Sequence, residues 1–95
     1  MPRYLVERTF ADGMNLNANE EGAVVCEAIV LNNTEHNVTW IQSYVSTDCR
    51  KMFCVYEAPS PEAIRRTAQR NNLPLDRITK VRVFDPYFHY RRVNT

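Results

Sequence analysis

The spacing of apolar residues switches repeatedly between two periods along these 95 residues, and the order of the switches constrains the fold more than any single motif. Alternation with period two is typical of half-buried strands, whereas apolar residues three or four positions apart indicate a helix. The pattern predicts strands over 3–10, 37–47, 51–58 and 78–84, and helices over 18–32 and 61–71.

Capping and turn residues support the helix boundaries. Glu20 and Glu21 favour the start of the first helix, because acidic groups are stabilised at the positive end of the helix dipole. The pair Asn32-Asn33 marks its end. The second helix is expected to start at Ser60-Pro61, since a serine hydroxyl accepts hydrogen bonds from free N–H groups and proline fits the first turn.

The resulting order, β-α-β-β-α-β, is that of the ferredoxin-like fold. We therefore expect an α+β domain whose four-stranded antiparallel sheet has the strand order 4-1-3-2, with both helices on one face. A chain of 95 residues fits one domain, here residues 1–84, followed by an aromatic and basic C-terminal tail at 85–95. The opposite face would be an exposed apolar patch, so we expect a second copy to cover it and form a dimeric α/β barrel.

Side-chain type predicts which residues lie on which face. The more aliphatic sets are expected beneath the helices: Tyr4, Val6, Ile41, Val45, Phe53, Val55, Val81 and Val83. A mixture of aromatic and polar side chains is expected on the open face: Leu5, Glu7, Trp40, Gln42, Tyr44, Cys54, Tyr56, Lys80 and Arg82. Because such a mixture is typical of an interface or a lined cavity, the predicted dimer interface comprises Leu5, Trp40, Tyr44 and Tyr56.

Composition excludes several classes of protein. The net charge is +1, whereas proteins that bind a nucleic-acid backbone usually carry a clear excess of positive charge. No run of apolar residues is long enough to span a membrane. The first eight residues place charges where a secretory signal needs an apolar run. Three cysteines without a C-x-x-C pair argue against a disulfide framework or a zinc knuckle, so we expect reduced thiols in a cytosolic protein.

Charge is distributed unevenly along the chain. Residues 1–47 hold two basic and six acidic side chains, a net charge of −4. Residues 48–95 hold ten basic and five acidic side chains, a net charge of +5. A self-associating protein can use this asymmetry, but a solvated surface is the simpler explanation and the one we favour.

Several short segments carry a resemblance to a known family. They are Tyr4-Leu5-Val6-Glu7-Arg8-Thr9-Phe10, Val38-Thr39-Trp40-Ile41-Gln42-Ser43-Tyr44-Val45 with Asp48, Phe53-Cys54-Val55-Tyr56, Ala58-Pro59, Glu62-Ala63-Ile64-Arg65 and Leu73-Pro74 with Ile78. Together they resemble a family of small bacterial ferredoxin-like proteins, the DUF4242 type, which includes a nickel-binding protein. The resemblance spans nearly all of residues 2–84. It implies a homodimer whose two sheets face each other, and a transition-metal site.

The predicted strand order brings a set of potential metal ligands together on the open face. The set consists of Glu7, Gln42, Tyr44, Cys54 and Tyr56. A thiolate, a carboxylate and phenol or amide oxygens can bind a divalent ion, with preference rising toward nickel and copper. The same residues could instead form a buried polar patch, with Cys54 acting as a small hydrophobe. His36 and His89 are further candidate ligands, because imidazole is a common metal ligand.

Other functions receive less support. The sequence contains no recognisable catalytic triad, glycine-rich phosphate loop or zincin motif. An enzyme or small-molecule-binding module that uses the dimer cavity without metal is the alternative interpretation. RNA-recognition motifs share the element order, but segment 51–57 lacks their glycine-containing pattern, and Glu7 would repel phosphate. We therefore expect no nucleic-acid or membrane partner.

Overall fold

A computed structural model of the chain describes residues 1–13 and 20–87. Its elements are β1 (Arg3–Thr9), α1 (Glu20–Glu35), β2 (Thr39–Val45), β3 (Lys51–Glu57), α2 (Pro61–Arg70) and β4 (Arg77–Val81). The predicted order of strands and helices is confirmed. Within the described ranges, no helix combines the length and the apolar character needed to cross a membrane.

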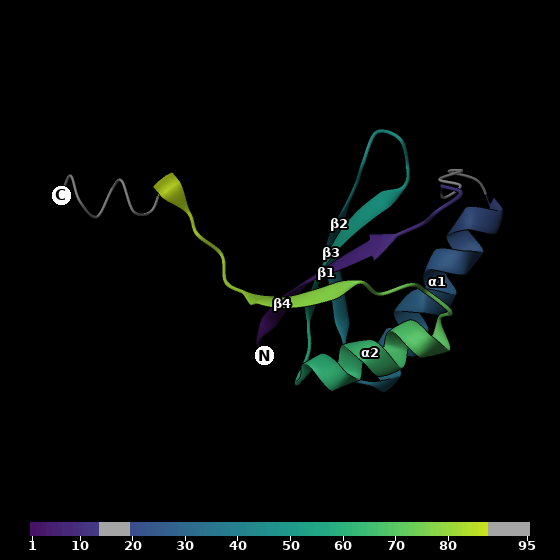
Figure 1. The fold of residues 1–95 in the computed structure, drawn as a ribbon. Helices are drawn as coiled ribbons and strands as arrows, with labels where there is room; N and C mark the ends of the chain where they lie inside the picture. Colours follow the sequence, from purple (N-terminus) through teal and green to yellow (C-terminus); the bar gives the residue numbers. More distant parts are fainter. Residues whose placement is uncertain (14–19, 88–95) are drawn as a thin grey trace.

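The four strands form one sheet in the order β2-β3-β1-β4, with every pair antiparallel. Both helices lie on the same side of this sheet, and the other side is open (Figure 1). This arrangement confirms the predicted ferredoxin-like fold and strand order. It leaves β2 and β4 as the two edge strands.

The second helix supplies much of the core. The Ser60 hydroxyl caps α2 by accepting a hydrogen bond from the backbone N–H of Ala63 at 3.3 Å, and Pro61 occupies the first turn. The inner face of α2 then buries Ala63, Ile64, Thr67 and Ala68 against the sheet. The buried cluster beneath the helices comprises Tyr4, Val6, Val38, Cys54, Tyr56, Ala58, Ala63 and Ile64.

Polar contacts join the first helix to α2. Asn32 Nδ2 donates to Asn71 Oδ1 at 2.7 Å, and Arg70 Nη2 pairs with Glu35 Oε2 at 3.0 Å. The helix ends at Glu35, three residues later than predicted, and the large apolar side chains of Val30 and Leu31 are exposed on it. Residues 18 and 19 of the predicted helix lie outside the described ranges.

The predicted topology is correct, but the predicted faces are wrong for β3 and β4. In an antiparallel pair, directly opposite residues share a face. Tyr4 lies opposite Tyr56, and Val6 opposite Cys54, so Cys54 and Tyr56 lie beneath the helices. Phe53 and Val55 therefore occupy the open face, as does Val81, which lies opposite Arg3; Lys80 lies opposite Tyr4 on the helix side.

An irregularity in β2 reverses the prediction for Trp40. The register between β2 and β3 shifts between Trp40 and Gln42, so these residues, two positions apart, lie on opposite faces. Trp40 pairs with Tyr56 and packs against the core, whereas Gln42 pairs with Val55 on the open side. Ile41, which was expected beneath the helices, lines a hollow on the open face.

The last strand ends three residues earlier than predicted. Residues 82–87, which we call the arm, follow β4 and run away from the sheet on the side opposite α1 (Figure 1). All six are exposed. Val83, expected in the core, is among them.

Candidate metal site on the open sheet face

The open face is organised in rows that run across the strands. One row contains Glu7 on β1, Phe53 on β3 and Tyr44 on β2, since Phe53 is the register partner of both others. The next row contains Leu5, Val55 and Gln42 in the same order of strands. Neighbouring strands are about 4.8 Å apart, so the backbones of Glu7 and Tyr44 are separated by roughly 10 Å, with the Phe53 ring between them.

Glu7 is the acidic residue in the first of these rows. Its side chain is 33% exposed, and its nearest described cation is Arg77, whose Nε lies 4.0 Å from Glu7 Oε2. Arg77 is itself largely exposed, and an ion pair at that separation in water contributes little. The Glu7 carboxylate is thus half-buried but only loosely held, which leaves its oxygens able to bind a cation from the open side.

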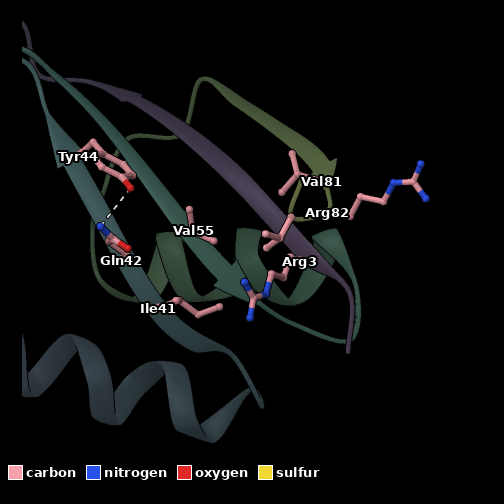
Figure 2. A pocket seen from close by; sticks show the side chains of 8 residues that line it. Arg3, Ile41, Gln42, Tyr44, Val55, Val81 and Arg82 are labelled. Carbon is pink, nitrogen blue, oxygen red and sulfur yellow. Dashed lines mark hydrogen bonds between the residues drawn. The ribbon is translucent and has the colours of Figure 1, made fainter. Parts of the chain in front are cut away.

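Gln42 and Tyr44 form the polar part of β2 on this face. Gln42 Nε2 donates to the Tyr44 hydroxyl oxygen at 3.1 Å, as the dashed line in Figure 2 indicates. This bond uses one amide proton and leaves the Gln42 carbonyl oxygen available as an acceptor. The pair therefore offers neutral oxygen ligands about two strand spacings from Glu7.

The structure does not bring the complete predicted ligand set together. Cys54 is 1% exposed and lies beneath the helices, on the opposite face of the sheet from Glu7. Tyr56 is buried beside it. The prediction that Glu7 and Cys54 share a face is wrong, because the apolar character of β3 is similar on its two sides.

The histidines do not complete the set either. His36 lies in the turn between α1 and β2, where its backbone N–H bonds to the Asn33 carbonyl oxygen at 3.1 Å. That turn precedes Thr39, whereas Tyr44 lies five residues further along β2, or roughly 17 Å at the rise of a strand. His89 lies outside the described residues. Within residues 1–13 and 20–87, no group of three histidine, cysteine or acidic side chains is placed to hold a metal ion.

Sequence reasoning missed a charged residue on the helix side. Arg8 is 2% exposed; its Nη1 donates to the Pro74 carbonyl oxygen at 2.5 Å and its Nη2 to the Tyr56 hydroxyl at 3.2 Å. Its Nε is buried without a hydrogen-bond partner. Alternation with Tyr4 and Val6 on β1 was the available signal, since it places position 8 on the buried side.

The open face also contains a hollow of about 390 Å³. It is lined by Arg3, Ile41, Gln42, Tyr44, Val55, Val81, Arg82 and Val83. Figure 2 shows Arg3 beside Val81 at the centre of this group, with Arg82 reaching outward. Arg3 is partly neutralised by Glu57, whose Oε1 lies 3.1 Å from Arg3 Nε. The hollow thus combines an aliphatic floor with polar groups at its sides.

Comparison with known proteins identifies the family. Residues 4–81 match the family described as "Nickel responsive protein SCO4226-like". The chain is also similar in structure to SCO4226 from Streptomyces coelicolor A3(2), whose crystal structure is known. The TM-score is 0.69 at 19% identity, over 87% of this chain and 99% of the other, a likeness that concerns the fold alone. No curated protein matches the sequence. The chain belongs to the nickel responsive protein SCO4226-like family.

Proposed function

We propose that this protein binds a divalent transition-metal ion, nickel first among them, on the open face of its sheet, in sites to which two copies of the chain contribute. The description of its family supports nickel as the ion. The position of Glu7 is the observation that carries the proposal: a half-buried carboxylate on the open face, with its nearest described cation 4.0 Å away. Binding of a cation stabilises a carboxylate in such a place, because it offsets the cost of partly burying the negative charge.

The need for a second copy follows from the number of ligands. Nickel favours sites with several nitrogen or oxygen donors. Among the described residues, one chain places Glu7, Tyr44 and Gln42 in neighbouring rows of this face. The Glu7 carboxylate fits a metal site, but the set from one chain is too small to enclose an ion. Two sheets packed face to face would bring two such sets together.

The apolar residues of the open face support the same arrangement. Leu5, Phe53 and Val55 lie between the polar groups, and the large side chains of Ile41 and Tyr44 are exposed. Soluble monomers rarely leave a contiguous apolar patch of this kind in water. The proposed interface is therefore Leu5, Ile41, Tyr44, Phe53 and Val55, in place of one that included Trp40 and Tyr56.

The hollow supports a second candidate function, a binding site for a small organic molecule without metal. Its volume of about 390 Å³ suits a small ligand, and its lining of valines with Arg3 and Gln42 is typical of such sites. A carboxylate ligand would compete with Glu57 for the Arg3 guanidinium.

Metal analysis and calorimetry together test the proposal. Protein purified without an affinity tag or chelator is analysed for bound metals, then stripped and titrated with Ni²⁺ while light scattering reports its mass. We expect micromolar or tighter binding by a species of twice the chain mass. A stripped protein that binds no divalent ion at micromolar concentration contradicts the metal site, and the hollow then becomes the leading candidate. A strictly monomeric protein that binds nickel contradicts the shared site.

A further inference from the structure

The hollow adjoins the proposed metal ligands on the open face. Gln42 and Tyr44 line it, and the same two side chains lie in the rows that contain Leu5 and Glu7. Arg3, which also lines the hollow, lies four residues before Glu7 on the same face of β1, so their backbones are roughly 14 Å apart. An occupant of the hollow and an ion at Glu7 would therefore be neighbours.

The described lining of the hollow is positively charged. Two of its eight residues are arginines, Arg3 and Arg82, and none of the eight is acidic. Arg82 reaches outward, whereas Arg3 lies at the centre of the group (Figure 2). Four of the other six residues are valine or isoleucine. A cationic hollow with aliphatic walls fits an organic anion that has an apolar body.

Arg3 is positioned to receive a carboxylate. Its Nε donates to Glu57 Oε1 at 3.1 Å, which holds the side chain over the sheet. A guanidinium has five N–H donors, and this bond uses one of them. Among the described residues, none accepts a hydrogen bond from either Nη atom of Arg3. Two free Nη groups of this kind bind a carboxylate through a pair of parallel hydrogen bonds.

The proposed metal site lacks negative charge as well as ligands. In the two rows that contain the proposed ligands, Glu7 is the one acidic residue of each chain, since Gln42 offers an amide and Tyr44 a phenol. A divalent ion carries twice the charge of one carboxylate. A second carboxylate, supplied by the occupant of the hollow, would balance the ion and add an oxygen donor.

We propose that the hollow binds a small aliphatic dicarboxylate together with the metal ion. One carboxylate of this ligand pairs with the Nη groups of Arg3, its methylene chain lies on Val55 and Val81, and its second carboxylate coordinates the ion bound at Glu7. The inference rests on the proposed metal site and joins it to the hollow, which otherwise stands as a separate candidate. The second sheet of the proposed dimer would cover the ligand and exclude water from it.

Calorimetry with matched acids tests the coupling. Succinate, glutarate, adipate and suberate vary the length of a dicarboxylate, and hexanoate has the chain length of adipate with a single carboxylate. Stripped protein is titrated with each acid, with and without saturating Ni²⁺, and each acid is titrated with Ni²⁺ in the absence of protein as a blank. We expect nickel to tighten the binding of at least one dicarboxylate by about tenfold or more, and to leave hexanoate binding unchanged. By linkage, that dicarboxylate tightens nickel binding by the same factor.

Variants separate the two ends of the ligand. Arg3→Gln should weaken the binding of hexanoate and of the dicarboxylate at least about tenfold, while nickel alone binds as before. Glu7→Gln should abolish the effect of nickel on the dicarboxylate and leave hexanoate binding unchanged. Glu57→Gln should tighten the binding of both acids, because it removes the carboxylate that shares Arg3, and a gain of affinity cannot come from misfolding. Arg65→Gln removes an exposed arginine that pairs with Glu62 at 3.2 Å on α2, and is the matched control.

The outcomes that overturn the proposal differ from those that overturn the metal site. If nickel binds but tightens no dicarboxylate, the ligand bridge is wrong and the metal site stands without it. If the acids bind and nickel does not, with or without a dicarboxylate, the metal site fails and the bridge fails with it. Equal acid affinities in wild type, Arg3→Gln and Glu57→Gln exclude Arg3 as the anchor and overturn the proposal even where nickel binds.

Discussion

The guanidinium of Arg8 and the phenol of Tyr56 form a buried pair beneath the two helices. Arg8 Nη2 donates to the Tyr56 hydroxyl at 3.2 Å, and Arg8 Cζ lies 5.9 Å from the centroid of the Tyr56 ring. No carboxylate among the described residues forms an ion pair with Arg8. The pair thus holds a positive charge in the core through neutral partners, a costly arrangement that depends on hydrogen bonding.

The first prediction concerns alkaline pH. Burial raises the pKa of Tyr56 to about 12, although the nearby charge of Arg8 opposes the rise. The folded protein therefore keeps a proton that the unfolded chain releases near pH 10, and stability should fall by about 1.4 kcal/mol per pH unit between roughly pH 10 and pH 12. Ultraviolet titration of tyrosinate should show one late step, lost in Tyr56→Phe and retained in Tyr44→Phe. A wild-type titration with no late step contradicts this assignment.

The second prediction concerns nickel. Glu7→Gln removes the charge of the proposed ligand and should weaken Ni²⁺ binding at least about tenfold in calorimetric titration. Glu57→Gln is the matched control, because Glu57 lies on the same face but is held by Arg3 at 3.1 Å. Cys54→Ser should leave nickel affinity unchanged, since Cys54 lies beneath the helices. A loss of nickel binding in Cys54→Ser that keeps its circular dichroism spectrum would place the site on the helix side.

The third prediction concerns the core. Ile64 on α2 is fully buried, so Ile64→Ala should reduce the free energy of unfolding by about 2–5 kcal/mol. Gln69→Ala, on the exposed side of the same helix, should change it by less than about 0.5 kcal/mol. Urea denaturation at fixed protein concentration measures both. Similar losses in the two variants would mean that α2 does not pack as described.

The fourth prediction concerns the turn between β2 and β3. Asp48 Oδ1 accepts hydrogen bonds from Ser46 Oγ at 2.6 Å and from the backbone N–H of Arg50 at 3.0 Å, and these bonds lower the pKa of Asp48 below 3.8. The stability that its charge contributes is present above pH 3.8 and is lost as pH falls through the lowered value. The Tm difference between wild type and Asp48→Asn should therefore shrink from pH 5 to pH 2. A difference independent of pH would exclude the charge as its cause.

The topology could be predicted because it depends on the period of the apolar pattern. Val6 and Arg8 alternate with Leu5 and Glu7, and Ser60 with Pro61 favours a helix start through capping and the fixed backbone angle of proline. These patterns are local, so they predict strands and helices without knowledge of the tertiary contacts. The strand order then followed from the handedness of the crossovers.

The faces of the central strand could not be predicted in the same way. In β3, Phe53 and Val55 on the open side are as apolar as Cys54 and Tyr56 on the buried side. A strand that is apolar on both sides does not indicate which side the helices cover. The residues opposite it on the neighbouring strand do indicate this side. Tyr4 was predicted beneath the helices, and Tyr56, which lies directly opposite Tyr4, must lie on the same face.

The error at Trp40 has a different cause. The register shift between Trp40 and Gln42 reverses which residues of β2 face the helices on one side of the shift. The residue type at Ile41 gives no sign of this shift in the sequence. The candidate site was affected by both errors. Glu7, Gln42 and Tyr44 were predicted on the correct face, and Cys54 and Tyr56 were not.

The irregular β2 also limits how this sheet can grow. An exposed, flat edge strand can recruit further strands without end, which is how many soluble domains begin to form fibrils. At one edge, the Trp40 indole N–H bonds to Ser43 Oγ at 2.7 Å beside the register shift in β2, which interrupts the ladder that an incoming strand would need. At the other edge, β4 has five residues, with Arg77 and Lys80 exposed to repel another strand. The irregular β2 and the short, charged β4 therefore both disfavour the pairing of a further strand at the edges of this sheet.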